Sequence, residues 1–196
     1  MGTREDIIAA AARIMRDEGY ARATTKEIAR AAGYSEAALY KHFHDKTEIF
    51  LTVLIERLPG LVPLLAGLPE RVGERAVRDN LVDVARTAIE FYAESFPVSA
   101  SVFSSRQLLA AHRERLREVA PGAGPGRPLT ELAAYLRAER DSGRVPAAVD
   151  PDAAAALLLG ACFQQAFLLA FADERPEGDS LDALAGELVG TLVAGW

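Results

Sequence analysis

The first 50 residues contain four helix-start signals in close succession, each followed by apolar residues at helical spacing. In two of them a threonine is followed three positions later by an acid, the spacing of a capping box that satisfies free backbone N–H groups at a helix start. The signals begin at Thr3, Thr24, Ser35 and Asp45. Helices this short are stable only when they pack against one another, so we expect a small helical bundle at the head of the chain.

Residues 24–46 have the pattern of two short helices joined by a glycine turn. Gly33 suits the left-handed conformation that commonly follows a helix end, and we expect the next helix over about 36–43. Leu39 and Phe43 lie four residues apart on that helix and would anchor its inner face. This arrangement is typical of a helix-turn-helix, which lays its second helix in the major groove of DNA.

The residues of this predicted helix that the core does not use would face outward. The first turn of a recognition helix usually meets base edges. There Glu36 can accept from a cytosine amino group, and Ala37 and Ala38 can contact a thymine methyl group. The candidate phosphate donors are Tyr40, Lys41, His42 and Lys46, with Lys26 for a phosphate or a guanine. The alternative is an ordinary exposed helix of a bundle.

Composition favours an all-helical protein. Half of the 196 residues are hydrophobic, alanine and leucine are abundant, and runs of β-branched residues are scarce. The first 50 residues carry equal numbers of acidic and basic side chains, so the net charge of −6 belongs to the rest of the chain. Residues 22–46 carry five basic and three acidic side chains, so this part of the head is locally positive. An acidic body behind it would limit indiscriminate DNA binding. The alternative is a solvated surface of mixed charge.

The single cysteine, Cys162, excludes an internal disulfide framework and fits a reducing compartment. No basic residue is close to it in sequence, so we expect a buried small hydrophobe and not a redox sensor. No basic-then-apolar signal peptide opens the chain, and we therefore expect a cytoplasmic protein.

Residues 4–54 resemble the TetR family of bacterial transcriptional regulators. The resemblance is carried by Thr24, Thr25, Ile28, Ala29, Ala32, Gly33, Ser35, Leu39, Tyr40, His42, Phe43, Lys46, Ile49, Phe50 and Leu54. It implies that the positions of Thr25, Tyr40 and Lys46 contact phosphates, and that those of Lys26, Glu36, Ala37, Ala38 and Lys41 can contact DNA. Two positions depart from the family pattern. Ala37 stands where relatives often have glycine or proline, and Glu36 places an acid on a helix that faces phosphates.

The resemblance also implies two domains, a DNA-binding head over 1–46 and a helical domain over 47–196 that binds a small molecule and pairs with a second copy. Apolar spacing independently predicts helices in the second part, at about 46–58, 70–95, 99–119, 128–142, 152–173 and 180–194. The expected breaks are at Pro59, Pro69, Pro97, Pro121, Pro146 and Pro176. The fold class is therefore all-α, with a three-helix helix-turn-helix head and a helical ligand-binding and dimerisation domain.

Residues 153–172 are apolar on every side except for Gln164 and Gln165. The segment is long enough to span a bilayer. Its flanks are acidic and not basic, and the two glutamines fall near its middle. A helix that is apolar all round is also what a helix buried on two faces looks like, so we expect a buried helix.

The last two predicted helices suit a four-helix bundle formed with a second copy. Leucines form a stripe on the final helix, beside two glycines four residues apart that permit close approach. The candidate interface residues are Leu157, Gln164, Leu168, Leu181, Leu184, Gly186, Leu188, Gly190 and Leu192. The family resemblance implies the same interface, and the alternative is the core helix of a monomer. A two-fold axis would place two recognition helices about one turn of DNA apart, on a near-palindromic operator.

Aromatic residues of the second part are candidates for an effector pocket. The candidates are Phe91, Tyr92, Phe96, Phe103, Tyr135, Phe163 and Phe167, with Cys162 and Gln165 as polar handles. Each can equally be plain core. Because convergent charged groups are absent, the expected ligand is small and mostly apolar.

Several short motifs are better explained structurally. Residues 178–181 match the motif of GDSL esterases, but no histidine follows Ser180, and Asp179 or Ser180 is expected to cap the last helix. The glycine-rich residues 122–126 are expected to be a connector, since no strand precedes them. The three histidines are too sparse for a metal site.

We therefore predict no catalytic residues, no metal site and no cofactor. The sequence favours a ligand-responsive DNA-binding regulator, a repressor that a small, mostly apolar effector releases from its operator. The alternative is a helical ligand-binding or enzymatic protein that does not read DNA.

Overall fold

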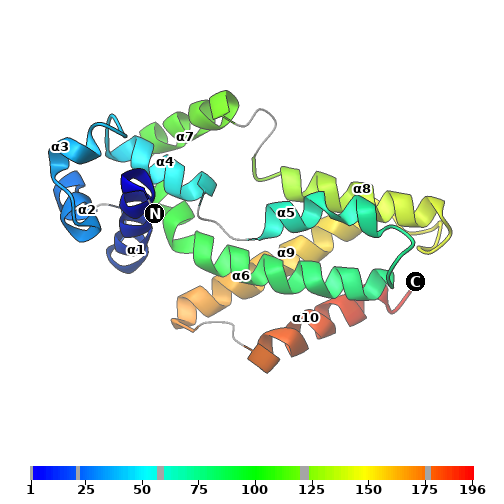
Figure 1. Cartoon of the computed structure of the whole chain (residues 1–196). Coiled ribbons are helices and arrows are strands. Elements are labelled where there is room, and N and C mark those ends of the chain that lie inside the picture. The colour runs from blue at the N-terminus through cyan, green and yellow to red at the C-terminus, as the bar shows by residue number, and fades with distance from the viewer. Residues whose placement is uncertain (1, 21–22, 57–59, 120–123, 175–177) are drawn as a thin grey trace. The chain divides into compact units, whose positions relative to one another are not determined.

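The computed structural model describes residues 2–20, 23–56, 60–119, 124–174 and 178–196, and all regular elements within these ranges are helices (Figure 1). The chain forms two compact units. Unit 1 comprises Met1–Leu58 and Glu94–Pro121, and unit 2 comprises Pro59–Ala93 and Gly122–Trp196. The all-helical fold class predicted from composition is confirmed.

Unit 1 is built around the four helices predicted for the head. Its helices are α1 Thr3–Glu18, α2 Thr25–Ala32, α3 Glu36–Leu39, α4 Lys46–Glu56 and α7 Arg106–Val119, together with the end of α6 Val77–Phe103. Helix α1 packs against α2 and α4, α2 packs against α3, and α7 packs against α4. The core includes Ile7, Ile8, Met15, Ile28, Leu39, Phe43, Ile49 and Phe50. The apolar spacing of the sequence thus identified the buried faces.

Three of the four helix-start signals act as predicted. Thr24 accepts from the Glu27 backbone N–H at 3.2 Å, and the Glu27 carboxylate accepts from the Thr24 N–H at 3.1 Å, completing the capping box. Ser35 and Asp45 each accept from a backbone N–H three residues on. The capping box at Thr3 was wrong. Helix α1 already includes Thr3, and its N-cap is a glycine that has no side chain to bond with.

Helix α3 is shorter than the predicted 36–43. It ends at Leu39 because the chain tightens there: the N–H groups of Lys41 and His42 bond three residues back, to Ala38 and Leu39. The next N–H, of Phe43, reaches the Leu39 carbonyl at 3.1 Å. Leu39 and Phe43 are nevertheless both buried, so the tighter turn keeps the inner anchors that the sequence predicted.

Unit 2 contains α5 Leu61–Ala66, the 3₁₀ helix η1 Leu68–Arg71, most of α6, α8 Arg127–Asp141, α9 Pro151–Ala172 and α10 Gly178–Val193. Helix α8 packs against α5, η1 and α9, and α9 packs against α10. Helices α5 and η1 were not predicted, because they are too short to show a helical period, and α6 begins later than predicted. Helix α10 begins at Gly178, so Asp179 and Ser180 lie in its first turn and do not precede it as caps.

Pro97 does not break a helix, contrary to the prediction. It lies within α6, which runs unbroken over 27 residues. A proline has no backbone N–H and so removes one helix hydrogen bond, but α6 continues past it without that bond. The breaks expected at Pro59, Pro121 and Pro176 lie outside the described residues.

Helix α9 is buried on one side and exposed on the other. Leu158, Leu159 and Cys162 are buried in the core of unit 2. Cys162 is fully buried, so the prediction of a buried cysteine is confirmed, and burial raises the pKa of its thiol to about 12. By length and hydropathy α9 could cross a membrane, a test that the core helix of a soluble protein passes as well. Because α9 packs against α8 and α10, one of its faces is that of a core helix.

A buried polar cluster joins α6 to α8 in unit 2. Asn80 donates to the Tyr135 hydroxyl at 2.8 Å, and burial raises the pKa of Tyr135 to about 12. One turn later on α8 the Glu139 side chain is 0 % exposed, and the Arg144 Nε lies 3.5 Å from its carboxylate. The Arg144 guanidinium also donates to the Arg75 carbonyl. A charge in such a position is tolerated only because a counter-charge is beside it.

We expect a histidine of unit 1 to make stability depend on pH. Burial lowers the pKa of His112, on α7, below its ordinary value of about 6.5. The unfolded chain therefore takes up this proton at a higher pH than the folded chain does. The free energy of unfolding should fall as pH drops below about 6.5, and chemical denaturation at a series of pH values measures it. A His112→Gln variant should lose less stability over this range; parallel curves for the two proteins would exclude the effect.

Candidate nucleic-acid interface

The turn between α2 and α3 has the geometry of a helix-turn-helix. Gly33 closes α2 with a φ of 81°, the left-handed conformation that was predicted for it. The Tyr34 N–H bonds to the Ala29 carbonyl at 2.9 Å, and the Tyr34 hydroxyl donates to Asp6 on α1 at 2.9 Å. These bonds fix the direction in which α3 leaves the turn, relative to α1.

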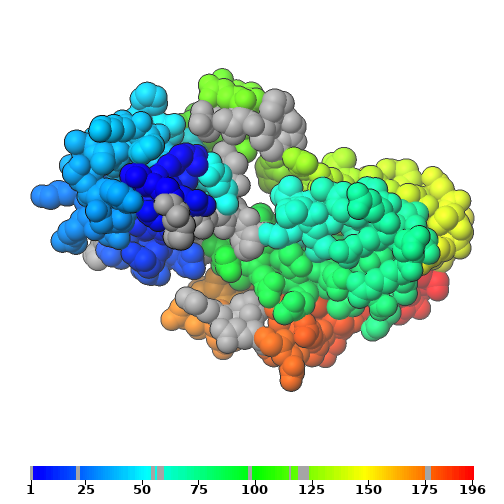
Figure 2. Space-filling view, in the orientation of Figure 1, coloured from blue at the N-terminus to red at the C-terminus, as the bar shows by residue number. Residues whose placement is uncertain are grey.

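The outward face of α2 and α3 carries most of the residues that were predicted to bind DNA. Burial of Ile28, Leu39 and Phe43 turns the opposite side chains toward solvent. Lys26, Ala37, Tyr40, Lys41 and His42 are exposed, and Thr25, Glu36, Ala38 and Lys46 are partly exposed. Figure 2 shows the atoms of α2 and α3 at the surface of unit 1. The fold thus brings the candidates from three separate helices onto one unit.

Three of these side chains are already hydrogen-bonded to one another. The Thr25 hydroxyl donates to the Glu36 carboxylate at 2.6 Å. The same Thr25 oxygen lies 3.4 Å from the Tyr40 hydroxyl. These groups were predicted to contact phosphates and a base separately, and this link between residues 11 positions apart was not predicted.

Lys46 is held by an aromatic ring that the sequence analysis did not single out. Its Nζ lies 4.0 Å from the centre of the Tyr20 ring, and partial burial lowers the pKa of Lys46. The Tyr20 ring packs edge-on against Phe50 at 4.5 Å, and its hydroxyl lies 3.3 Å from that of Thr47. The start of α4 is thereby fixed beside Tyr20, which follows α1, with the Lys46 ammonium positioned by that ring.

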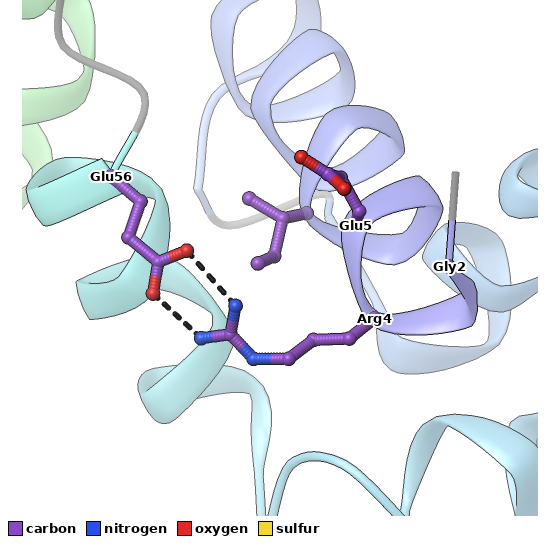
Figure 3. Close-up of a pocket in the computed structure, with 5 residues that line it drawn as sticks. Gly2, Arg4, Glu5 and Glu56 are labelled. Atoms are coloured by element: carbon purple, nitrogen blue, oxygen red, sulfur yellow. Dashed lines mark hydrogen bonds and ion pairs between the residues drawn. The ribbon is translucent and has the colours of Figure 1, made fainter.

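Arg4 joins the start of α1 to the end of α4 (Figure 3). Its guanidinium makes a two-pronged ion pair with Glu56, at 2.6 and 2.9 Å, and lies 5.7 Å from the centre of the Phe43 ring. A recess of about 330 Å³ opens beside this pair and is lined by Gly2, Arg4, Glu5, Ile8 and Glu56. Its exposed charges differ from the apolar lining expected of an effector site. No signal in the sequence could have paired residues 52 positions apart.

The predicted pocket residues do not all come together. Tyr92 packs edge-on against Phe91 at 5.3 Å and against Phe163 of α9 at 5.4 Å, so these three form one aromatic cluster in unit 2. Tyr135 and Cys162 are buried in the core of unit 2, while Gln165 is partly exposed and Phe167 stacks on exposed Phe171. Phe96 and Phe103 belong to unit 1.

Most predicted interface residues lie at the surface of α9 and α10. Leu157 and Leu168 are 66 % and 47 % exposed, and Gln164 is exposed between them. Leu184, Gly186, Leu188, Gly190 and Leu192 are partly exposed along α10. Leu181 is buried within its own chain, so it cannot contact a second copy as predicted. The structure adds Phe171, 83 % exposed, to the same face of α9.

Two family profiles match the chain. The profile of the bacterial regulatory proteins of the tetR family matches residues 7–53, which contain α2, α3 and the turn between them. The profile of the C-terminal domain of AefR-like transcriptional repressors matches residues 79–195, more than half of the chain. The chain belongs to the TetR family. The resemblance of residues 4–54 to that family is thus confirmed.

Individual relatives support the same family and fold. The HTH-type transcriptional repressor AcnR of Corynebacterium efficiens is 30 % identical to this TetR-family chain over 106 residues, 48 % of the chain and 56 % of the relative. The chain thus aligns with little more than half the length of this curated relative. A candidate TetR-family regulator from Mesorhizobium loti matches with a TM-score of 0.76 and 21 % identity, over 98 % of this chain and 95 % of that one. FadR of Bacillus subtilis, solved with stearoyl-CoA, matches with a TM-score of 0.68 and 21 % identity, over 98 % of both chains.

Proposed function

We propose that this TetR-family protein is a homodimeric, ligand-responsive transcriptional repressor of the cytoplasm that binds a near-palindromic operator. The observation that carries the proposal is the outward face of α2 and α3. A capping box and a left-handed Gly33 set the turn, and buried Leu39 and Phe43 hold α3 with Lys41 and Tyr40 toward solvent. The repressor relative AcnR and the two family profiles support this assignment.

In this proposal, bases are read at Glu36, Ala37 and Ala38, and phosphates are bound by the cations and hydroxyls around them. The phosphate-binding residues are Thr25, Lys26, Tyr40, Lys41, His42 and Lys46. Phosphate contacts fix the register of the helix on the duplex, and base contacts give sequence preference. We assign the protein no enzymatic role, because its family and its relative AcnR are transcriptional regulators.

The proposed effector is a small, mostly apolar molecule bound in the C-terminal domain. The cluster of Phe91, Tyr92 and Phe163 supplies apolar surface, and the related fold of FadR was solved with the acyl ligand stearoyl-CoA. Effector and operator would weaken each other reciprocally, by about 1–3 kcal/mol if the coupling is of ordinary size. Helix α4 begins at Lys46 beside the proposed DNA surface, and Arg4 holds its end through Glu56, so movement of α4 would reach the head.

Selection from a pool of random DNA duplexes tests the proposal. We expect the wild-type protein to enrich a near-palindrome whose half-sites are centred about one helical turn apart. Lys41→Ala should lower affinity for the enriched duplex and reduce the slope of log affinity against log salt by about one per half-site. Tyr40→Phe should lower affinity to a similar degree on every sequence, because it removes a phosphate donor.

Arg137→Ala is the matched control, because it removes one exposed positive charge from unit 2. It should leave both affinity and salt slope unchanged. If no sequence is enriched, the result favours a helical ligand-binding or enzymatic protein that does not read DNA. If Arg137→Ala and Lys41→Ala behave alike, the assignment of the α2–α3 face is wrong.

A further inference from the structure

We infer that Glu36 restrains binding to DNA of arbitrary sequence by holding the hydroxyl of Thr25 in the unbound protein. The inference rests on the proposed function and assigns to Glu36 a part in specificity beyond reading one base. Its physical basis is competition: a carboxylate of the protein occupies a donor that a phosphate would otherwise use.

The contacts of the Thr25 hydroxyl define this competition. The Thr25 hydroxyl has one proton, and it donates that proton to the Glu36 carboxylate at 2.6 Å. Thr25 is the first residue of α2 and Glu36 the first residue of α3, so the bond joins the two halves of the helix-turn-helix. The Tyr40 hydroxyl lies 3.4 Å from the same Thr25 oxygen. A phosphate that takes the Thr25 proton must therefore displace Glu36 and approach its negative charge.

The other carboxylates near this surface are used differently. Glu27 turns back to the Thr24 N–H and hydroxyl, at 3.1 and 2.8 Å. Asp45 and Glu48 bond the backbone N–H groups of Glu48 and His44 at the start of α4. These carboxylates accept hydrogen bonds from backbone N–H groups at helix starts. Glu36 instead bonds a side chain of the proposed DNA surface.

Displacing Glu36 from Thr25 costs the same free energy on every DNA sequence, but only some sequences compensate for this cost. On an arbitrary duplex, the freed carboxylate would face phosphates and base acceptors, which repel it. A cytosine amino group in the major groove can donate to it, so a suitable base compensates for the lost Thr25 bond. Glu36 should consequently weaken non-specific binding more than operator binding, in a head whose exposed Lys26 and Lys41 attract any duplex.

The test compares wild type with Glu36→Gln, a variant of nearly the same shape that removes the charge and replaces the charge-assisted bond to the Thr25 hydroxyl with a weaker neutral one. Fluorescence anisotropy measures affinity for a random-sequence duplex and for the duplex that wild type selects, over a series of salt concentrations. We expect Glu36→Gln to bind the random duplex about three- to tenfold more tightly than wild type does. On the selected duplex the gain in affinity over wild type should be smaller. Selection with the variant should also lose a cytosine preference in each half-site.

Glu18→Gln is the matched control, because it removes one exposed carboxylate from the end of α1 in the same unit. It should change random-duplex affinity less than Glu36→Gln does. Equal effects of the two variants, or an unchanged ratio of selected to random affinity in Glu36→Gln, would overturn the inference while leaving the proposed function intact. If wild type enriches no sequence and neither wild type nor Glu36→Gln binds any duplex, the proposed function and this inference both fail. Thermal unfolding of each variant verifies that the head is folded.

Discussion

Replacing Arg144 with methionine should lower the free energy of unfolding by about 3–5 kcal/mol, as measured by chemical denaturation. The reason is the position of its partner. The Glu139 side chain is 0 % exposed, and Arg144 lies within 3.5 Å of its carboxylate. Methionine keeps much of the apolar stem of arginine but leaves the carboxylate without a counter-charge. The neighbouring hydroxyl of Tyr135 accepts a hydrogen bond from Asn80 and is neutral, so it cannot replace the lost positive charge.

Two further variants separate this effect from ordinary loss of a surface ion pair. Arg137→Met breaks the bond at 2.8 Å between Arg137 of α8 and Asp152 of α9, where both side chains are exposed, and should cost less than about 1 kcal/mol. The double variant Glu139→Gln with Arg144→Met should recover most of the loss, because no buried charge remains. Equal losses for Arg144→Met and Arg137→Met would show that the buried carboxylate does not need its partner.

The head of the chain could be predicted from sequence because its determinants are local. A capping box needs two residues three positions apart, and the left-handed turn needs only Gly33. The features that were missed join residues far apart in sequence. Arg4 meets Glu56 only after α1 has packed against α4, and Thr25 meets Glu36 only after α2 has packed against α3. The early end of α3 was not predicted either, because residues four apart such as Leu39 and Phe43 share a face whether the chain stays α-helical or tightens after Leu39 as it does here.

The effector site could not be assigned in the same way, because aromatic residues serve cores and pockets alike. Tyr135 illustrates this: sequence made it a pocket candidate, and the structure bonds it to Asn80 in the core. Phe103 lies in unit 1, although it was predicted to share a pocket with residues that lie in unit 2. Composition specified that these rings are apolar, but only tertiary packing decides which of them meet, as Tyr92 and Phe163 do.

Replacing Leu168 with glutamate should convert the protein from dimer to monomer, as measured by sedimentation velocity. Leu157, Leu168 and Phe171 are 66 %, 47 % and 83 % exposed on one face of α9. Apolar side chains grouped in this way usually mark an interaction surface. A glutamate there is solvated in the monomer, so the fold of the chain should be retained, but pairing of two copies would bury its charge without a partner. Because two linked half-site contacts become one, affinity for the full operator should fall by about 100-fold or more.

Leu129→Glu is the control for this prediction, since it places the same charge at a leucine that is 37 % exposed on α8, outside the proposed interface. It should remain dimeric and bind the operator as wild type does. The affinity of Leu168→Glu for an isolated half-site should also equal that of wild type, because its α2–α3 face is unchanged. A Leu168→Glu protein that stays dimeric would place the interface elsewhere. A monomeric Leu168→Glu protein that retains full operator affinity would show that pairing of two heads does not supply the binding energy.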